Sequence, residues 1–73
     1  MKGIRKARLL KSIPSNRYRI LFESASSPSK GDLVYLDQGF TDASGKSMVL
    51  VYCVDEKGNS MYEAEVYESE LSS

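Results

Sequence analysis

The feature that most constrains this sequence is its one uninterrupted apolar run, residues 48–54 (MVLVYCV). It contains three β-branched valines and no charge, a pattern typical of a strand buried on both faces. Turn-forming residues lie on both sides, Gly45 to Ser47 before the run and residues 55–59 after it. Residues 60–67 then alternate between apolar and polar side chains. The sequence therefore predicts a β-hairpin over residues 47–67 with its turn at Gly58.

The basic N-terminal part of the chain fits two patterns. Apolar residues every third position from Ile4 to Ile13 suit a helical stripe, whereas alternation over residues 6–13 suits a strand. A compact turn follows at Pro14, and residues 17–23 alternate like a strand. A strand directly after a tight turn favours a strand before it. We therefore predict a first hairpin over residues 6–23 and leave the helical alternative for residues 4–13 open.

The remaining segments complete a small all-β domain. Residues 24–31 are rich in serine and, with residues 38–46, are expected to be surface loops; residues 32–36 form a short strand between them. A chain of 73 residues is one domain, 1–73, and we expect disorder in residues 1–5. Five short strands in a chain of this length predict a small closed or half-closed barrel.

Three motifs carry a resemblance to a known fold family. Residues 30–35 (KGDLVY), a meander over residues 48–66 and a terminal turn at residues 68–71 (ESEL) together resemble a Src-homology-3-like small barrel. The resemblance covers roughly residues 30–71 and implies a five-stranded barrel built on a meander with the central hairpin. The chain has no tryptophan to wall a proline-binding groove. Because this fold supports many functions, the resemblance implies an architecture and no particular activity.

The charge is balanced overall but divided along the chain. Ten basic and ten acidic residues give a net charge of zero. Residues 1–19 hold seven of the bases and no acid, so the other 54 residues hold three bases and all ten acids. One interpretation is a basic arm for an anionic partner. We favour the other, in which basic and acidic strands lie side by side and neutralise each other across the sheet.

Few residues offer catalytic chemistry. The chain has no histidine, which removes the commonest general base and metal ligand. Its single cysteine, Cys53, lies in the most apolar run, so we expect a buried structural thiol. Residues 39–47 imitate a phosphate-binding loop, but Phe40 stands at the first glycine position and a strand follows where a helix is needed. We therefore expect no enzyme activity, no metal site and no cofactor.

The expected location of the protein is the cytoplasm. No apolar run approaches the roughly 20 residues of a membrane span. The basic N-terminus lacks the apolar segment of a signal peptide, and a lone thiol suits a reducing compartment.

Tyrosine is the side chain on which we base the favoured function. The chain has five tyrosines, and tyrosine supplies apolar contact area with a polar end. A domain this small has one core, so one of the two side-chain rows of residues 48–54 needs a cover, which the N-terminal segment, a second copy or a larger partner could supply. We therefore predict a non-catalytic binding module or accessory subunit that makes protein–protein contacts or self-associates. The candidate contact residues are Tyr18, Tyr35 and Tyr67.

Nucleic-acid binding by the basic first hairpin is the alternative. Basic side chains interleaved with Tyr18 form the kind of stripe that holds a phosphate backbone. A sequence pI of about 6.2 and the acidic C-terminal strand argue against it. The candidate residues are Lys6, Arg8, Lys11, Arg17 and Arg19.

Overall fold

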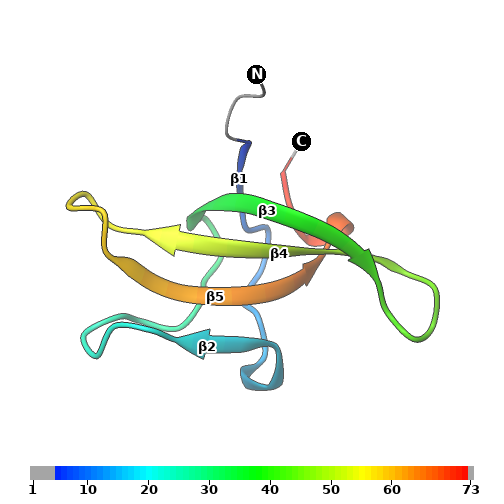
Figure 1. The fold of residues 1–73 in the computed structure, drawn as a ribbon, viewed down its shortest axis with the longest axis horizontal. Coiled ribbons are helices and arrows are strands. Elements are labelled where there is room, and N and C mark those ends of the chain that lie inside the picture. Colours follow the sequence, from blue (N-terminus) through cyan, green and yellow to red (C-terminus); the bar gives the residue numbers. More distant parts are fainter. Residues whose placement is uncertain (1–4, 73) are drawn as a thin grey trace.

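The computed structural model describes residues 5–72, and this part of the chain is all-β (Figure 1). The expectation of disorder in residues 1–5 falls on the segment 1–4, outside the described residues, except for Arg5. Two short 3-10 helices, η1 and η2, accompany five strands. The elements are β1 (Lys6–Arg8), η1 (Ser15–Arg17), β2 (Tyr18–Ile20), β3 (Leu33–Thr41), β4 (Ser47–Val54), β5 (Ser60–Tyr67) and η2 (Glu68–Glu70). No helix in residues 5–72 has the length and apolar character needed to cross a membrane.

The five strands form one antiparallel sheet in the order β1-β3-β4-β5-β2. The central hairpin is confirmed, since β4 and β5 pair antiparallel from Met48 opposite Tyr67 to Val54 opposite Ser60. β3 extends this hairpin into a three-stranded meander. The sheet keeps two edges, β1 and β2, and so does not close into the predicted barrel.

The turn of the central hairpin depends on a left-handed glycine. Gly58 has a φ of +89°, and a Cβ atom added there would meet no atom within 4 Å. A side chain at this position is therefore disfavoured by the backbone conformation and not by crowding. Asp55 Oδ1 fixes the same turn by accepting the amides of Lys57 and Asn59 at 2.9 and 2.8 Å.

We expect Gly58→Val to lower the free energy of unfolding by about 1 kcal/mol or more. Gly58→Asn is the matched control, because asparagine tolerates positive φ, and it should cost clearly less. Urea denaturation of both variants measures the difference. Equal costs for valine and asparagine would contradict the conformational explanation.

The predicted first hairpin is wrong. β1 and β2 do not pair with each other: Ala7 lies opposite Val34 of β3, and Arg19 lies opposite Glu63 of β5, at the other edge. Between the two strands the chain passes behind the meander (Figure 1) and buries Leu9. Burial of apolar side chains beneath the sheet has prevailed over the local turn signal.

The segment between β1 and β2 is neither the predicted helix nor a continuous strand. Ile13 is also buried beneath the sheet, and its amide donates to the carbonyl of Pro28. Leu10, which a helical stripe would bury, is exposed, so the helical alternative fails where the structure describes it. Strand-like alternation of burial holds from Lys6 to Leu10 and ends at Lys11.

Two predicted boundaries also differ from the structure. β3 continues to Thr41, so residues 38–41 of the predicted loop are strand and the connection is residues 42–46. A register shift between Leu36 and Gly39 absorbs the turn-like residues within the strand. Residues 24–31 lie outside any strand, as the serine-rich composition indicates.

The core lies on one face of the sheet. Its central side chains are Val34, Val49, Val51, Tyr62 and Val66. The prediction that residues 48–54 are buried on both faces holds at Met48, which is buried on the side opposite the core, but it is too strong for the rest of the strand. The neighbouring positions Leu50 and Tyr52 are only half-buried, because the other face of the sheet is open at these positions. The face that carries Tyr52 is called the outer face below.

Cys53 is half-buried and not fully buried as expected. It stands at the end of β4, where the pairing with β5 shifts register, so the core covers it only in part. Burial is still the main effect on the thiol and raises the pKa of Cys53.

Candidate protein-contact surface

One row of directly opposed residues crosses the outer face from edge to edge. Lys6 of β1 lies opposite Tyr35 of β3, which lies opposite Tyr52 of β4. Tyr52 lies opposite Glu63 of β5, which lies opposite Arg19 of β2. This outer row combines two adjacent tyrosines at its centre with charged residues towards both edges.

The contacts along the outer row follow from this register. The Lys6 Nζ atom lies 5.8 Å from the centre of the Tyr35 ring, within range of a cation–π interaction. At the opposite edge, Arg19 Nη2 lies 3.0 Å from Glu63 Oε2. Basic and acidic side chains of adjacent strands do therefore neutralise each other across the sheet at this edge, as the favoured interpretation of the charge pattern expects. Tyr35 and Tyr52 are half-buried and keep part of their surface open.

The structure separates the three tyrosines that the sequence singled out. Tyr35 lies on the outer face, whereas Tyr18 lies opposite Ala64 and packs against the core. Tyr67 lies at the other end of the outer face and is held in a polar network. Tyr52, which the sequence reasoning missed, is the residue that Tyr35 meets. Only the pairing of β3 with β4 brings these two together, so no local spacing could have indicated it.

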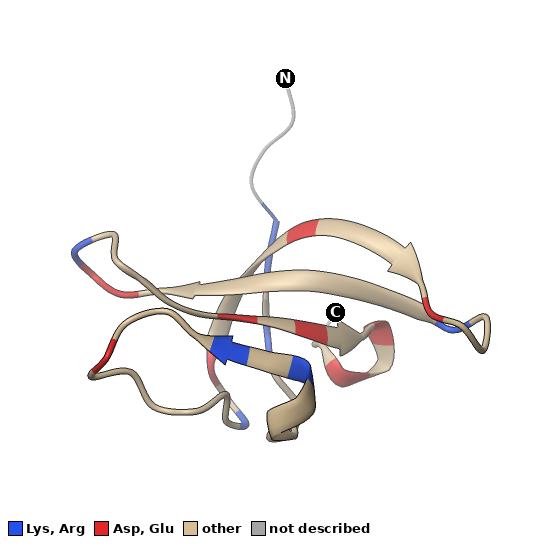
Figure 2. Cartoon of the chain, turned by 60° about the horizontal axis from the view of Figure 1, so that its bottom comes forward, with Lys and Arg blue, Asp and Glu red and all other residues tan. Residues whose placement is uncertain are grey.

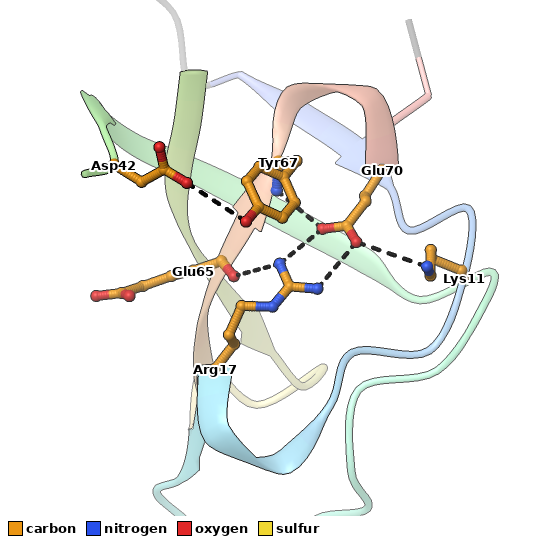
Figure 3. A network of polar contacts seen from close by, with 6 residues as sticks. All are labelled: Lys11, Arg17, Asp42, Glu65, Tyr67 and Glu70. Atoms are coloured by element: carbon orange, nitrogen blue, oxygen red, sulfur yellow. Dashed lines mark hydrogen bonds and ion pairs between the residues drawn. The ribbon is translucent and has the colours of Figure 1, made fainter. Parts of the chain in front are cut away.

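A polar network around Glu70 fixes Tyr67 and the η2 turn (Figure 3). The two guanidinium nitrogens of Arg17, Nη1 and Nη2, donate to the two carboxylate oxygens of Glu70, each at 2.9 Å. The Tyr67 amide also donates to Glu70 Oε1, at 2.8 Å, and Lys11 Nζ lies 3.9 Å from Oε2. The Arg17 and Glu70 side chains are only 17% and 8% exposed. Such a bidentate pair holds both groups in one geometry.

The network occupies the polar groups of Arg17 and holds the half-buried Tyr67 ring between two basic side chains. The Arg17 guanidinium carbon lies 4.9 Å and Lys46 Nζ 5.5 Å from the centre of the Tyr67 ring. The Tyr67 hydroxyl donates to Asp42 Oδ2 at 3.4 Å, and Arg17 Nη1 also donates to the carbonyl of Glu65 at 3.2 Å. Hydrogen bonding to Arg17 lowers the pKa of Glu70, and the same bond raises the pKa of Arg17. Arg17 and Glu70 therefore stabilise the fold.

The five basic candidates for nucleic-acid binding do not form one stripe. Lys6 and Arg8 lie in β1, at one edge of the sheet, and Arg19 lies in β2, at the other. In Figure 2 the basic bands of β2 and of the adjoining end of η1 run beside the acidic bands of β5. Arg8 Nη1 donates to the carbonyl of Gly31 at 2.9 Å, and Lys11 and Arg17 face Glu70. The acidic neighbours offset much of the positive field that a phosphate backbone requires.

Among residues 5–72, no group of three or more aspartate, glutamate, histidine or cysteine side chains stands close enough to hold a metal ion. Comparison of the chain with models of protein families, with curated proteins and with solved structures gives no match.

Proposed function

We propose that this chain is a small non-catalytic binding module that contacts a protein partner through its outer face. The observation that carries the proposal is the direct opposition of Tyr35 and Tyr52 at the centre of that face. Tyrosine is enriched where proteins meet, since its ring gives apolar area and its hydroxyl stays hydrogen-bonded to water or to the partner.

The surroundings of the two tyrosines support the same proposal. Leu33 is exposed and Leu50 is half-buried; both belong to the outer face by strand alternation and add apolar area to it. Lys6 at one edge and the Arg19–Glu63 pair towards the other supply a charged border. An apolar, aromatic centre inside a polar rim is the usual anatomy of a protein interface.

Nucleic-acid binding has weaker support. The bases that it requires are divided between β1, β2 and the segment after β1, and carboxylates face three of them. A polyanion bound along the outer row would also meet the carboxylate of Glu63, next to Arg19.

We also propose that the chain has a Src-homology-3-like arrangement of strands and resides in the cytoplasm. The β3–β4–β5 meander, the η2 turn and the return of Leu71 to a bridge with Leu9 favour a Src-homology-3-like arrangement of strands. The half-buried free thiol of Cys53 suits the reducing cytoplasm.

Site-specific photo-crosslinking tests the outer face. A benzophenone amino acid at position 52 should form an adduct of defined mass with a protein in extracts of the native cell. The same group at Ser26, exposed in the serine-rich loop, is the control and should give no such adduct. Adding Tyr35→Ser to the position-52 probe should reduce the adduct about tenfold, as loss of an aromatic hot spot does. Equal adducts from positions 26 and 52, or an adduct that nuclease removes, would contradict the proposal.

A further inference from the structure

The second open surface of the molecule is the edge of the sheet at β2. At the opposite edge, the C-terminal segment of the chain pairs with the end of β1 and the residues after it. The Ser72 amide donates to the carbonyl of Arg8, and the Leu10 amide donates to the carbonyl of Glu70. β2 pairs with β5 on one side only. Among residues 5–72, no backbone hydrogen bond outside the sheet pairing joins Tyr18 or Ile20 to another segment.

The register shows which backbone groups this edge presents. Leu21, directly after β2, donates its amide to the carbonyl of Met61, so Leu21 and Met61 are a hydrogen-bonded pair. Hydrogen-bonded pairs alternate along an antiparallel ladder. Arg19 opposite Glu63 is then the next bonded pair, and Ile20 opposite Tyr62 is not. The amide and the carbonyl of Ile20 therefore point away from β5, towards the open side.

The side chains of residues 20–22, at the end of this edge, are apolar and exposed. Ile20, Leu21 and Phe22 are 39%, 40% and 39% exposed. They are three of the five large hydrophobic residues exposed in the part of the chain that the structure describes. Phe22 and Val54 also form the apolar part of an open hollow whose other lining residues are Asp55, Glu56, Lys57 and Asn59. A free sheet edge with apolar side chains is a template on which a further strand can pair.

We propose that β2 pairs antiparallel with β2 of a second copy of this chain, which joins the two sheets edge to edge. The charges at the edge favour a neutral partner, because Glu63 neutralises Arg19 and Glu70 neutralises Arg17. A partner strand therefore needs apolar side chains and no carboxylates. The segment Ile20–Phe22 itself meets that requirement.

The self-pairing has a register that suits its side chains. With the two-fold axis at Ile20, the two Ile20 residues exchange both of their free backbone hydrogen bonds. Arg19 then lies opposite Leu21 of the other copy, so like charges do not face each other across the join. β2 has only three residues, and so short an edge gives a small interface and a weak, reversible dimer.

Sedimentation equilibrium over a concentration series tests the pairing. We expect the weight-average mass to rise from that of one chain towards that of two between about 10 μM and 1 mM, the range of small transient interfaces. Ile20→Lys should lower the association constant about tenfold or more, because a charged lysine on an edge strand disfavours pairing with another strand. Its unfolding midpoint should stay close to that of the unmodified protein, since Ile20 is already partly exposed.

Leu10→Lys is the matched control, because Leu10 is 49% exposed but its backbone is already bonded to Glu70. This variant should associate like the unmodified protein. A chain that stays monomeric throughout the series would overturn the proposal. An Ile20→Lys variant that still forms dimers, or equal losses in the two variants, would also overturn it. Association abolished by Tyr52→Ser, with Ile20→Lys unaffected, would place the self-contact on the outer face instead.

Discussion

Glu70→Ala is expected to lower the free energy of unfolding at pH 7 by about 3 kcal/mol or more, the usual cost of removing one partner of a buried ion pair. The reason is that Arg17, only 17% exposed, would lose both carboxylate acceptors and keep a poorly solvated charge. A domain of this length has a total stability of about 4–11 kcal/mol. The thermal midpoint, followed by circular dichroism, should therefore fall by about 12 °C or more.

The same pair makes the stability dependent on pH. Folding lowers the pKa of Glu70 below its ordinary value of 4.5, chiefly through the hydrogen bond from Arg17. A carboxyl whose pKa is lower in the folded state stabilises the fold above its unfolded pKa, and loses that contribution as the pH falls through the folded one. The stabilisation from Glu70 is thus complete at pH 7 and declines below about pH 5.

Two further variants separate charge from shape. Glu70→Gln keeps the size of the side chain and should cost about 1–2 kcal/mol at pH 7, as loss of a charged hydrogen-bond partner does. Its difference from the unmodified protein should shrink as the carboxyl protonates in acid. Glu68→Gln, exposed in the same turn, should change the stability by less than about 0.5 kcal/mol. If Glu70→Gln and Glu68→Gln had equal effects at pH 7, the carboxylate pair would have no special role.

Tyr62→Ala is expected to cost about 3–5 kcal/mol, as removal of a large buried aromatic ring does. Tyr62 is 2% exposed and is the largest of the fully buried side chains. Its hydroxyl donates to Asp32 Oδ2 at 2.8 Å, and burial together with this bond raises the pKa of Tyr62. Tyr62→Phe removes only the hydroxyl and should cost about 1 kcal/mol.

Urea denaturation of the two Tyr62 variants compares the ring with the hydroxyl. Tyr52→Ala is the control on the neighbouring strand, where the ring is half-buried on the outer face, and it should cost less than Tyr62→Ala. A Tyr62→Phe variant as unstable as Tyr62→Ala would show that the bond to Asp32 contributes more than packing. Equal costs at positions 52 and 62 would contradict the assignment of the two faces.

The central hairpin was predictable because its signals are local. An apolar run, a glycine-bearing turn and an alternating segment all lie within residues 47–67, and the strand bounds agree with the structure. The extension of β3 to Thr41 was not predictable, since Asp37-Gln38-Gly39 has the composition of a turn and only pairing with β4 holds it extended.

The candidate site depends on contacts between distant parts of the chain, and the sequence gives no local signal for them. β1 and β2 pair with strands that follow much later, and the segment between them buries Leu9 and Ile13 beneath the sheet. Arg17 and Glu70 are 53 positions apart and match no spacing rule. The sequence alone therefore does not distinguish Glu70 from the other acidic residues of the C-terminal segment, although its side chain is buried.

The pairing of residues 8–10 with residues 70–72 has a consequence for synthesis on the ribosome. The Arg8 amide donates to the Ser72 hydroxyl across 64 positions of sequence, and Leu9 bridges Leu71. A chain elongating from its N-terminus cannot form these bonds until its last described residues have left the exit tunnel. The β3–β4–β5 meander is complete earlier, and contacts of such long sequence separation form slowly. Until then the nascent chain carries β1 without the residues that cover its edge, and an uncovered strand edge is open to wrong pairing.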